Sequence, residues 1–318
     1  MISPIEDIAK GYNQTFQANK LSLGLVVPIE SYPDSRIPSM QDHLNRVKLA
    51  EDLGFSAIWV RDVPFDVPQF GDVGQTFDPF TYLGYLAAST HKITLGVSSI
   101  ALPLHQPVHV AKSSATLDHM SEGRFVLGVA SGDRPLEYPA TGLQYAHRGE
   151  MFQEAFEYIR RSQDHFPTFE TTHFGSAQGI DILPKPISKR IPMLITGFSQ
   201  QSMEWNAEHG DGWMYYPQNV RSQEKMIDEW RKLSSKFSNY TKPFMQPLYV
   251  DLTENDDTPP TPIHLGIRTG SHHLLEYFQV LQEIGVNHVA INLRFNQLPI
   301  QRTIEHLATK VLDKIHSS

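Results

Sequence analysis

The feature that most constrains the fold is a repeated alternation of short apolar runs with segments of helical length. The segment from Arg148 illustrates the helical pattern, since Phe152, Ala155, Phe156 and Ile159 fall on one stripe of a helix. The apolar runs predict strands at 21–27, 57–60, 93–97, 125–130, 193–196, 212–215, 244–252 and 288–293. Strand and helix units repeated in this way over 318 residues favour one α/β domain spanning 1–318, a (β/α)₈ TIM barrel.

Two stretches depart from this alternation. Residues 166–192 (FPTFETTHFGSAQGIDILPKPISKRIP) predict an inserted extended ribbon with turns, and the acidic, Pro-rich run Thr253–Pro262 predicts a mobile surface loop and candidate lid. A doubly wound open sheet is the competing fold, but it needs a Gly-rich turn after its first strand. Leu23–Ser31 contains only Gly24, inside the strand, so the barrel is favoured.

Composition excludes several classes of function. The net charge of -8 argues against binding to nucleic acid, and the absence of cysteine excludes disulfides, thiolate metal sites and thiol nucleophiles. His105 and His109 have a metal-like spacing, but Pro107 lies between them and no carboxylate accompanies them, so no metal site is predicted. The first twenty residues do not resemble a signal peptide, and no run reaches the roughly 20 apolar residues of a membrane span. We therefore expect a cytoplasmic protein.

Small polar residues gather where predicted strands end, which is where parallel α/β folds hold ligands. Ser98 and Ser99 follow one apolar run, and Ser131 and Gly132 follow the next. The segment Thr196–Ser202 (TGFSQQS), with Gly197, leads from a strand into a helix. There Ser199 as N-cap and Ser202 one turn later predict a phosphate seat, although an ordinary capped helix would have the same sequence. Likewise, Ser98 and Ser99 could simply fit a crowded rim.

Charged residues also lie at these ends. Arg61 and Asp62 follow the strand at 57–60, either as a plain ion pair or as part of a site. His147 and Arg148 precede a helix, where they could bind an anion or a carbonyl oxygen, or where the histidine could simply be solvated.

With these residues in place, the chain from Leu21 to Leu312 resembles the bacterial luciferase-like flavin monooxygenase family. The motifs that carry the resemblance are AEDLGFSAIWV, LGVSSIALPLHQPVHVAKSSATLDHMSEGRFVLGVASG and TGFSQQSMEWNAEHGDGW. The resemblance implies a barrel that binds FMN, or in some relatives a deazaflavin, at the carboxyl ends of the strands. It also implies a non-proline cis peptide at Ser98 and Ser99. The flavin phosphate would then be held by Ser131, Gly132, Gly197, Ser199 and Ser202.

The sequence departs from the family pattern at two positions. Asp62, preceded by Arg61, stands where luciferases have a histidine that assists the flavin chemistry. Ser131 stands where they have a phosphate-binding arginine, with Arg134 three residues further on. These departures affect the expected reaction rather than the fold.

The resemblance favours a two-component monooxygenase, in which reduced FMN from a partner flavin reductase reacts with dioxygen to oxidise a small organic substrate. Asp62 and Arg61 would set the polarity beside the ring, and His105 or His147 would move a proton. The alternatives are a deazaflavin-dependent dehydrogenase and a non-catalytic flavin-binding protein. Candidates for the longer deazaflavin tail are scattered along the chain: Arg36, Arg61, Arg134 and Arg148. The resemblance also implies a homodimer.

Overall fold

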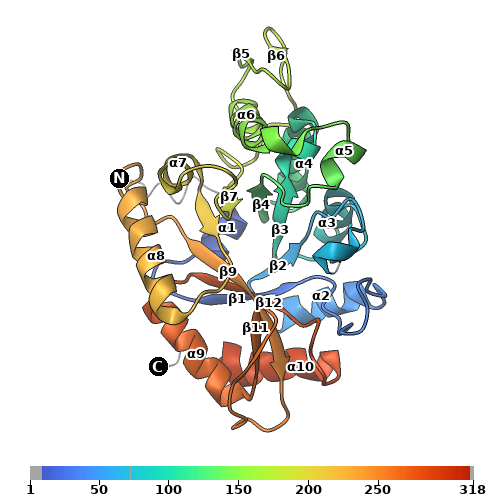
Figure 1. The fold of residues 1–318 in the computed structure, drawn as a ribbon, viewed down its shortest axis with the longest axis vertical. Coiled ribbons are helices and arrows are strands. Elements are labelled where there is room, and N and C mark those ends of the chain that lie inside the picture. The colour runs from blue at the N-terminus through green and yellow to red at the C-terminus, as the bar shows by residue number, and fades with distance from the viewer. Residues whose placement is uncertain (1–8, 72, 316–318) are drawn as a thin grey trace.

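The computed structural model describes residues 9–71 and 73–315, and within them eight parallel strands close into a barrel (Figure 1). Each strand pairs with the next, β8 pairs with β9, and β12 returns to β1 to complete the ring. The barrel strands are β1 (Ser22–Val26), β2 (Ala57–Val60), β3 (Thr94–Ala101), β4 (Phe125–Ala130), β7 (Met193–Thr196), β8 (Gly212–Met214), β9 (Phe244–Leu252) and β12 (His288–Asn292). The predicted (β/α)₈ barrel is confirmed.

Helices surround the strands and bury their apolar stripes against them (Figure 1). The stripe predicted for the helix at Arg148 is confirmed, because Phe152, Ala155, Phe156 and Ile159 are all buried. The outer helices are α2 (His43–Asp52), α3 (Pro79–Ala87), α4 (Pro107–Met120), α6 (Arg148–Arg161), α7 (Met203–His209), α8 (Val220–Ser234), α9 (Ser271–Glu283) and α10 (Ile300–Leu307). None of the described helices is long and apolar enough to cross a bilayer.

Side chains fill the barrel interior around Trp59. Gly96 is required beside it, since a Cβ there would lie 2.3 Å from the indole ring. The indole Nε1 donates to His288 Nε2 at 2.8 Å, and burial lowers the pKa of His288 to about 3. The imidazole is therefore neutral and can accept this bond. Because the interior is packed, a ligand must bind at an end of the barrel.

The amino ends of the strands, which we call the floor, are covered by α1 (Lys10–Thr15). The Tyr12 hydroxyl donates to the backbone carbonyl of Asp211 at 2.6 Å. The Asp211 carboxylate is 2.7 Å from Arg160 and 2.5 Å from Arg190. Burial opposes ionisation of Asp211, but the two guanidinium groups outweigh it and hold its pKa below the ordinary value. The floor is thus a structural end, held together around the buried Asp211 carboxylate.

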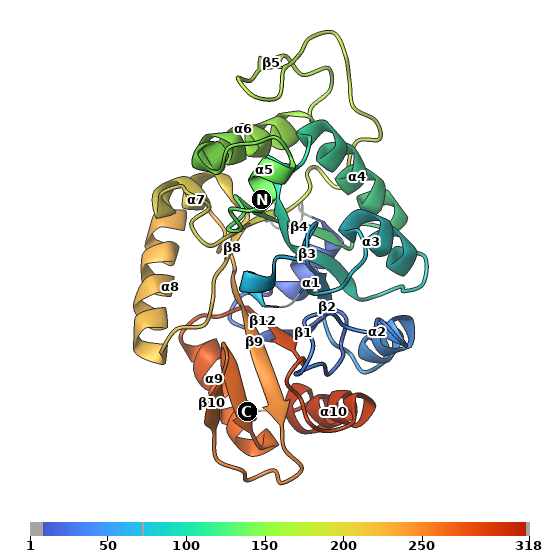
Figure 2. The same cartoon turned by 45° about the vertical axis from the view of Figure 1, so that its right-hand side comes forward.

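The inserted ribbon predicted at 166–192 is confirmed. It contains β5 (Phe169–Glu170) paired antiparallel with β6 (Ser176–Ala177) and projects beyond α6, away from the barrel (Figures 1 and 2).

The segment expected to form a lid is anchored at its start. Asp256 accepts a hydrogen bond from Ser271 Oγ at 2.7 Å and one from Lys310 Nζ at 3.0 Å, which ties the loop after β9 to the outer helical layer. The chain then forms an antiparallel hairpin of β10 (Thr261–Ile263) and β11 (Gly266–Thr269), and β11 pairs with β9. The part of this region that reaches the barrel mouth is the tip of the hairpin, at His264 and Leu265.

Candidate active site

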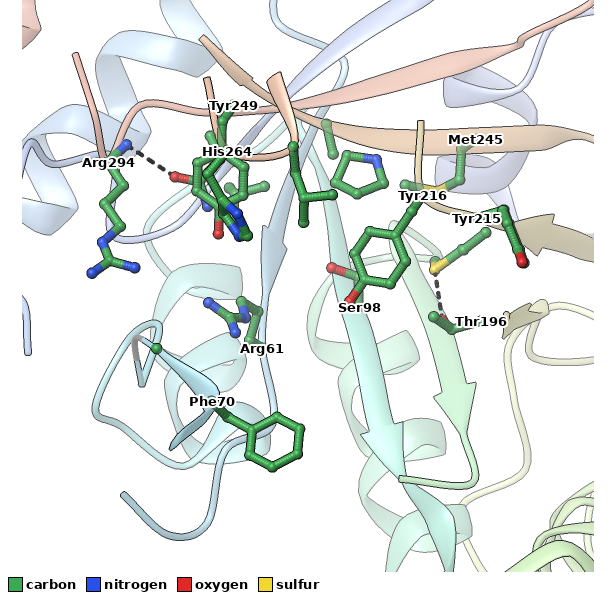
Figure 3. A pocket seen from close by; sticks show the side chains of 17 residues that line it. Arg61, Phe70, Ser98, Thr196, Tyr215, Tyr216, Met245, Tyr249, His264 and Arg294 are labelled. Carbon is green, nitrogen blue, oxygen red and sulfur yellow. Dashed lines mark hydrogen bonds between the residues drawn. The ribbon is translucent and has the colours of Figure 1, made fainter. Parts of the chain in front are cut away.

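Two adjoining cavities open at the carboxyl ends of the strands. The mouth cavity lies over the barrel axis (Figure 3). The rim cavity lies beside it, between the ends of β3, β4 and β7 and the loops that follow them. The two cavities share five lining residues among those described: Arg61, Phe70, Ser98, Thr196 and Tyr216. They therefore form one elongated space.

Ser98 and Ser99 lie at the junction of the two cavities. Their peptide bond is cis and precedes no proline, as the family resemblance implied. The pairing of β3 with β4 shifts register here, between Val97 and Ile100. The small side chains leave room for a ligand to lie against the strand end.

The rim cavity brings together the turns after β4 and β7. The Ser131 amide donates to Ser199 Oγ at 3.3 Å, and Ser199 Oγ donates to the Thr196 carbonyl at 2.8 Å. Gly132 has φ 74°, and a Cβ there would lie 2.8 Å from the Tyr138 hydroxyl. Gly197 has φ 59°. These predicted residues therefore form one cradle of backbone and hydroxyl groups.

The prediction of Ser199 as the helix N-cap is wrong. Ser199 and Gln200 adopt positive φ values of 49° and 63°, so the chain makes a turn before the helix starts at Met203. Ser202 is the N-cap, since its hydroxyl accepts from the Trp205 amide at 3.1 Å. Ser202 lines neither cavity, and its hydroxyl serves the helix rather than the predicted phosphate seat.

Asp62 and His105 form a pair behind the rim. His105 Nε2 lies 2.7 Å from Asp62 Oδ2, which also accepts from the Ala101 amide at 3.1 Å. Burial lowers the pKa of His105, but the hydrogen bond to Asp62 and its charge outweigh this effect and raise that pKa. Asp62 lines the rim cavity, whereas His105 stands behind it. The carboxylate thus braces the end of β3 and holds a protonatable imidazole close to the site.

His147, just before α6, and Arg148, the first residue of α6, point to different places. His147 has a side chain that is 51% exposed, lies 3.5 Å from Glu150 and lines neither cavity, so its predicted catalytic position is not supported. Arg148 lines the rim cavity with its guanidinium 3.7 Å from the Tyr145 ring centroid, and its Nη1 donates to the Tyr145 carbonyl at 3.0 Å. Its buried Nε has no hydrogen-bond partner among the described residues.

Arg134 and Glu137 add a second charged pair to the rim cavity. Their closest polar atoms, Arg134 Nη1 and Glu137 Oε1, are 3.9 Å apart, and each is buried without a hydrogen-bond partner in the described part of the chain. Burial raises the pKa of Glu137 to about 7; Arg134 opposes the shift, while Asp62 and Asp133 add to it. Nothing in the sequence singled out Glu137.

The mouth cavity contains residues that sequence reasoning missed. Arg294 follows β12, Tyr216 follows β8, and His264 stands at the tip of the β10–β11 hairpin (Figure 3). The strand-end rule that found Arg61 would also have found Arg294 and Tyr216. Among the described residues, no group of three or more His, Cys, Asp or Glu side chains is placed to hold a metal ion.

This barrel, with a cavity across the carboxyl ends of its strands, has the architecture of a (β/α)₈ enzyme. Residues 21–257 match the family model for luciferase-like monooxygenases. The chain is 32% identical over 192 residues to an uncharacterised protein of Mycobacterium tuberculosis, covering 54% of this chain and 67% of that protein. It is 26% identical over 165 residues to the alkanal monooxygenase alpha chain of Photorhabdus luminescens, covering 51% of this chain but only 44% of that protein.

Solved structures share the fold at lower identity. A monooxygenase from Streptomyces bottropensis superposes with a TM-score of 0.75 at 18% identity, covering 93% of this chain and 100% of that one. An F420-dependent secondary alcohol dehydrogenase superposes with a TM-score of 0.75 at 18% identity, covering 92% of this chain and 98% of that one. Because the family match spans well over half of the chain, the protein belongs to the luciferase-like monooxygenase family and is an oxidoreductase.

Proposed function

We propose that this protein is an FMN-dependent monooxygenase that oxidises a small organic substrate with dioxygen. The observation that carries the proposal is the elongated space at the barrel mouth. It joins the end of β3, at Ser98 and Ser99, to a cradle whose buried Arg134 and Arg148 donors have no partner in the described part of the chain. A flat ring with an anionic tail has this shape and this distribution of polarity.

The rim cavity fits a phosphate monoester. Arg134 Nη1 and Arg148 Nε are buried donors without a hydrogen-bond partner among the described residues, and Ser199 Oγ faces the turn after β4. A phosphate oxygen would satisfy the guanidinium donors with charge-assisted bonds. Gly197 allows the backbone to approach a ligand closely, since a Cβ there would meet no atom within 4 Å, whereas the missing Cβ of Gly132 leaves space for the Tyr138 hydroxyl.

The charge balance of the rim cavity favours FMN over a cofactor with a long polyanionic tail. Among the described lining residues, three arginines face three carboxyl groups: Arg61, Arg134 and Arg148 against Asp62, Asp133 and Glu137. With this charge balance, the cavity can accept the charge of one phosphate but not that of a polyanion. Partial protonation of Glu137, whose pKa is about 7, favours the phosphate further.

Bound FMN, once reduced, would supply the electrons for dioxygen to oxidise the substrate. The residues of this chain would orient the ring, exclude water and manage protons around it. Asp62 would stabilise a protonated His105 behind the rim, which could then donate a proton to the site. The hairpin tip at His264 and Leu265 would cover the mouth cavity. In this scheme a separate flavin reductase provides reduced FMN, which enters through the open mouth.

A deazaflavin-dependent dehydrogenase is the second candidate. One observation favours it: Arg61, Arg134 and Arg148, which the sequence left scattered, converge on one cavity. The opposing carboxyl groups weigh against it.

Melting temperatures with FMN, riboflavin and a deazaflavin would separate the two candidates. A ligand at about 100 times its Kd stabilises the fold by about 2.7 kcal/mol, which is readily measured. We expect FMN to stabilise the protein most, and the complex with reduced FMN, once mixed with dioxygen, to transfer one oxygen atom to a substrate while the other leaves as water. Stabilisation by the deazaflavin alone, with hydride transfer under argon, would contradict the proposal.

A further inference from the structure

The mouth cavity carries positive charge in a chain whose net charge is -8. Two arginines, Arg61 and Arg294, line it, and none of its described lining residues is Asp or Glu. Figure 3 shows the two arginine side chains on the same side of the cavity, with Ser98 and Tyr216 on the other. The charge is therefore concentrated at one end of a largely apolar space.

Arg294 is held in place by its surroundings. Its Nη2 donates to the Ser35 carbonyl at 2.9 Å, and its guanidinium carbon lies 5.2 Å from the Tyr32 ring centroid and 5.1 Å from that of Phe295. Contacts on two aromatic rings restrict the rotamers of a long side chain, so little entropy is lost when it binds a ligand. Arg294 is a pre-organised cation at the edge of the cavity.

The backbone and the stem of Arg61 are also held in place. Its backbone amide donates to Gln75 Oε1 at 2.8 Å, and the Gln75 side-chain amide donates to its carbonyl. Its stem packs against Gly74, where a Cβ would lie only 3.2 Å from Arg61 Cδ. The missing side chain at Gly74 leaves the space that Arg61 occupies.

Most of the remaining wall is apolar or aromatic. Met214, Met245 and Leu265 line the cavity together with Tyr216 and Phe70. Methionine and aromatic side chains adapt to hydrophobic ligands of varied shape. The wall thus suits a carbon skeleton.

We propose that the substrate of this oxidoreductase is an organic anion, a carboxylate or sulfonate with an apolar body. Its charged head group binds Arg61 and Arg294, and its body lies against Tyr216 and Met245. Guanidinium groups bind carboxylate and sulfonate oxygens with charge-assisted hydrogen bonds. This inference rests on the proposed function, in which the cofactor ring occupies the neighbouring space at Ser98 and Ser99.

The test uses the FMN-loaded protein and three probes of one chain length: octanoate, octane-1-sulfonate and the neutral octanamide. Benzoate, benzenesulfonate and benzamide repeat the comparison with an aromatic body. Calorimetric titration should give each anion an affinity about tenfold higher than its amide, the effect of one charge-assisted hydrogen bond. Arg294→Met should abolish this preference while FMN affinity stays within about twofold.

Two further variants test whether the effect of Arg294→Met comes from misfolding rather than from the lost charge. Arg294→Lys keeps the charge and should retain part of the preference. Arg302→Met removes an exposed arginine that pairs with Glu254 outside the cavity, and it should change nothing. Melting temperature and circular dichroism report the folding of each variant.

Three results would overturn the inference: amides that bind as tightly as the anions, an anion preference that survives in both Arg61→Met and Arg294→Met, or a loss of FMN affinity in Arg294→Met. The last would assign this guanidinium to the cofactor. If the wild-type protein binds no FMN, the proposed function fails separately, and the same titrations on the flavin-free protein still decide the anion preference.

Discussion

The two ends of the barrel differ in how they treat buried charged groups: among the described residues, the Asp211 carboxylate at the floor is fully hydrogen-bonded, whereas two arginines at the rim are not. At the floor, the Asp211 carboxylate accepts from Arg160, Arg190 and the Met193 amide. At the rim cavity, Arg134 and Arg148 each bury a guanidinium nitrogen that has no hydrogen-bond partner among the described residues. Leaving such a group unsatisfied costs about 1–3 kcal/mol, more when it is charged. We infer that the charged groups at the floor stabilise the fold and that the arginines at the rim bind a ligand.

The largest effect should come from Asp211→Ala, which leaves the guanidinium groups of Arg160 and Arg190 at the floor without their carboxylate. Because a fully buried carboxylate is removed and the buried Met193 amide loses its acceptor, we expect the free energy of unfolding to fall by about 3 kcal/mol. Urea denaturation followed by circular dichroism measures the loss. The folded fraction should bind FMN with unchanged affinity.

Glu254→Ala is the control for this experiment. Glu254 pairs with Arg302 on the surface, where both side chains are more than half exposed, so its loss should cost less than about 1 kcal/mol. A variant at Asp211 that lost FMN affinity but no stability would reverse the roles of the two ends.

Arg148→Met should show the opposite behaviour. Removing a charge-assisted bond to phosphate costs about 1.5–3 kcal/mol, so FMN affinity should fall roughly 10- to 100-fold. Affinity for riboflavin, which lacks the phosphate, should not change. Fluorescence titration with both flavins measures the difference.

Arg161→Met is a matched control at the other end of α6. Arg161 also contacts an aromatic ring, Phe169, at 5.4 Å and donates to a carbonyl, that of Thr168, at 2.6 Å, but it lines neither cavity. If both variants weakened FMN binding equally, the effect of Arg148 would be structural.

Glu137→Gln tests whether the rim, unlike the floor, buries a carboxyl group that is costly to ionise. Burial raises the pKa of Glu137 to about 7, so the folded protein binds a proton that the unfolded chain releases at lower pH. The stability that this proton contributes is present below the unfolded pKa and is lost as pH rises towards about 7.

Urea denaturation at about pH 5 and about pH 8 should therefore show wild-type protein losing about 2 kcal/mol relative to Glu137→Gln. Parallel pH profiles for the two proteins would mean that Glu137 titrates normally.

The smallest changes in FMN affinity and stability are expected at Ser199 and Ser202, which the sequence analysis assigned to the same phosphate site. Ser199→Ala should weaken FMN binding about fivefold, since one hydroxyl contributes about 1 kcal/mol. Ser202→Ala should leave FMN affinity unchanged and lower stability by about 1 kcal/mol through loss of the helix cap. Equal effects of both variants on FMN affinity would restore the predicted phosphate seat.

The sequence predicted the barrel well because each strand is a short buried run with its own signal. The strand β9 at Phe244–Leu252 has the predicted bounds. The sequence did not predict α1 or the β10–β11 hairpin. The helix α1 is held by distant contacts such as Thr15 with Thr94, and the hairpin begins inside an acidic, Pro-rich run whose sequence is typical of a loop.

The site was predicted in part, for the same physical reason. Strand ends can be read locally, so Arg61, Ser98, Ser131 and Gly132 were found, and the structure gathers them. Contacts between distant segments cannot be read this way. The pairing of Asp62 with His105 across 43 residues, and the positive φ at Ser199 that delays α7, depend on the assembled fold.

A crystal structure of the protein soaked with FMN tests the central claim most directly. We expect the ring to lie against Ser98 and Ser99 and the phosphate to contact Ser199 and the guanidinium of Arg148. A flavin bound elsewhere, or a phosphate that leaves the buried nitrogens of Arg134 and Arg148 without a partner, would contradict the account.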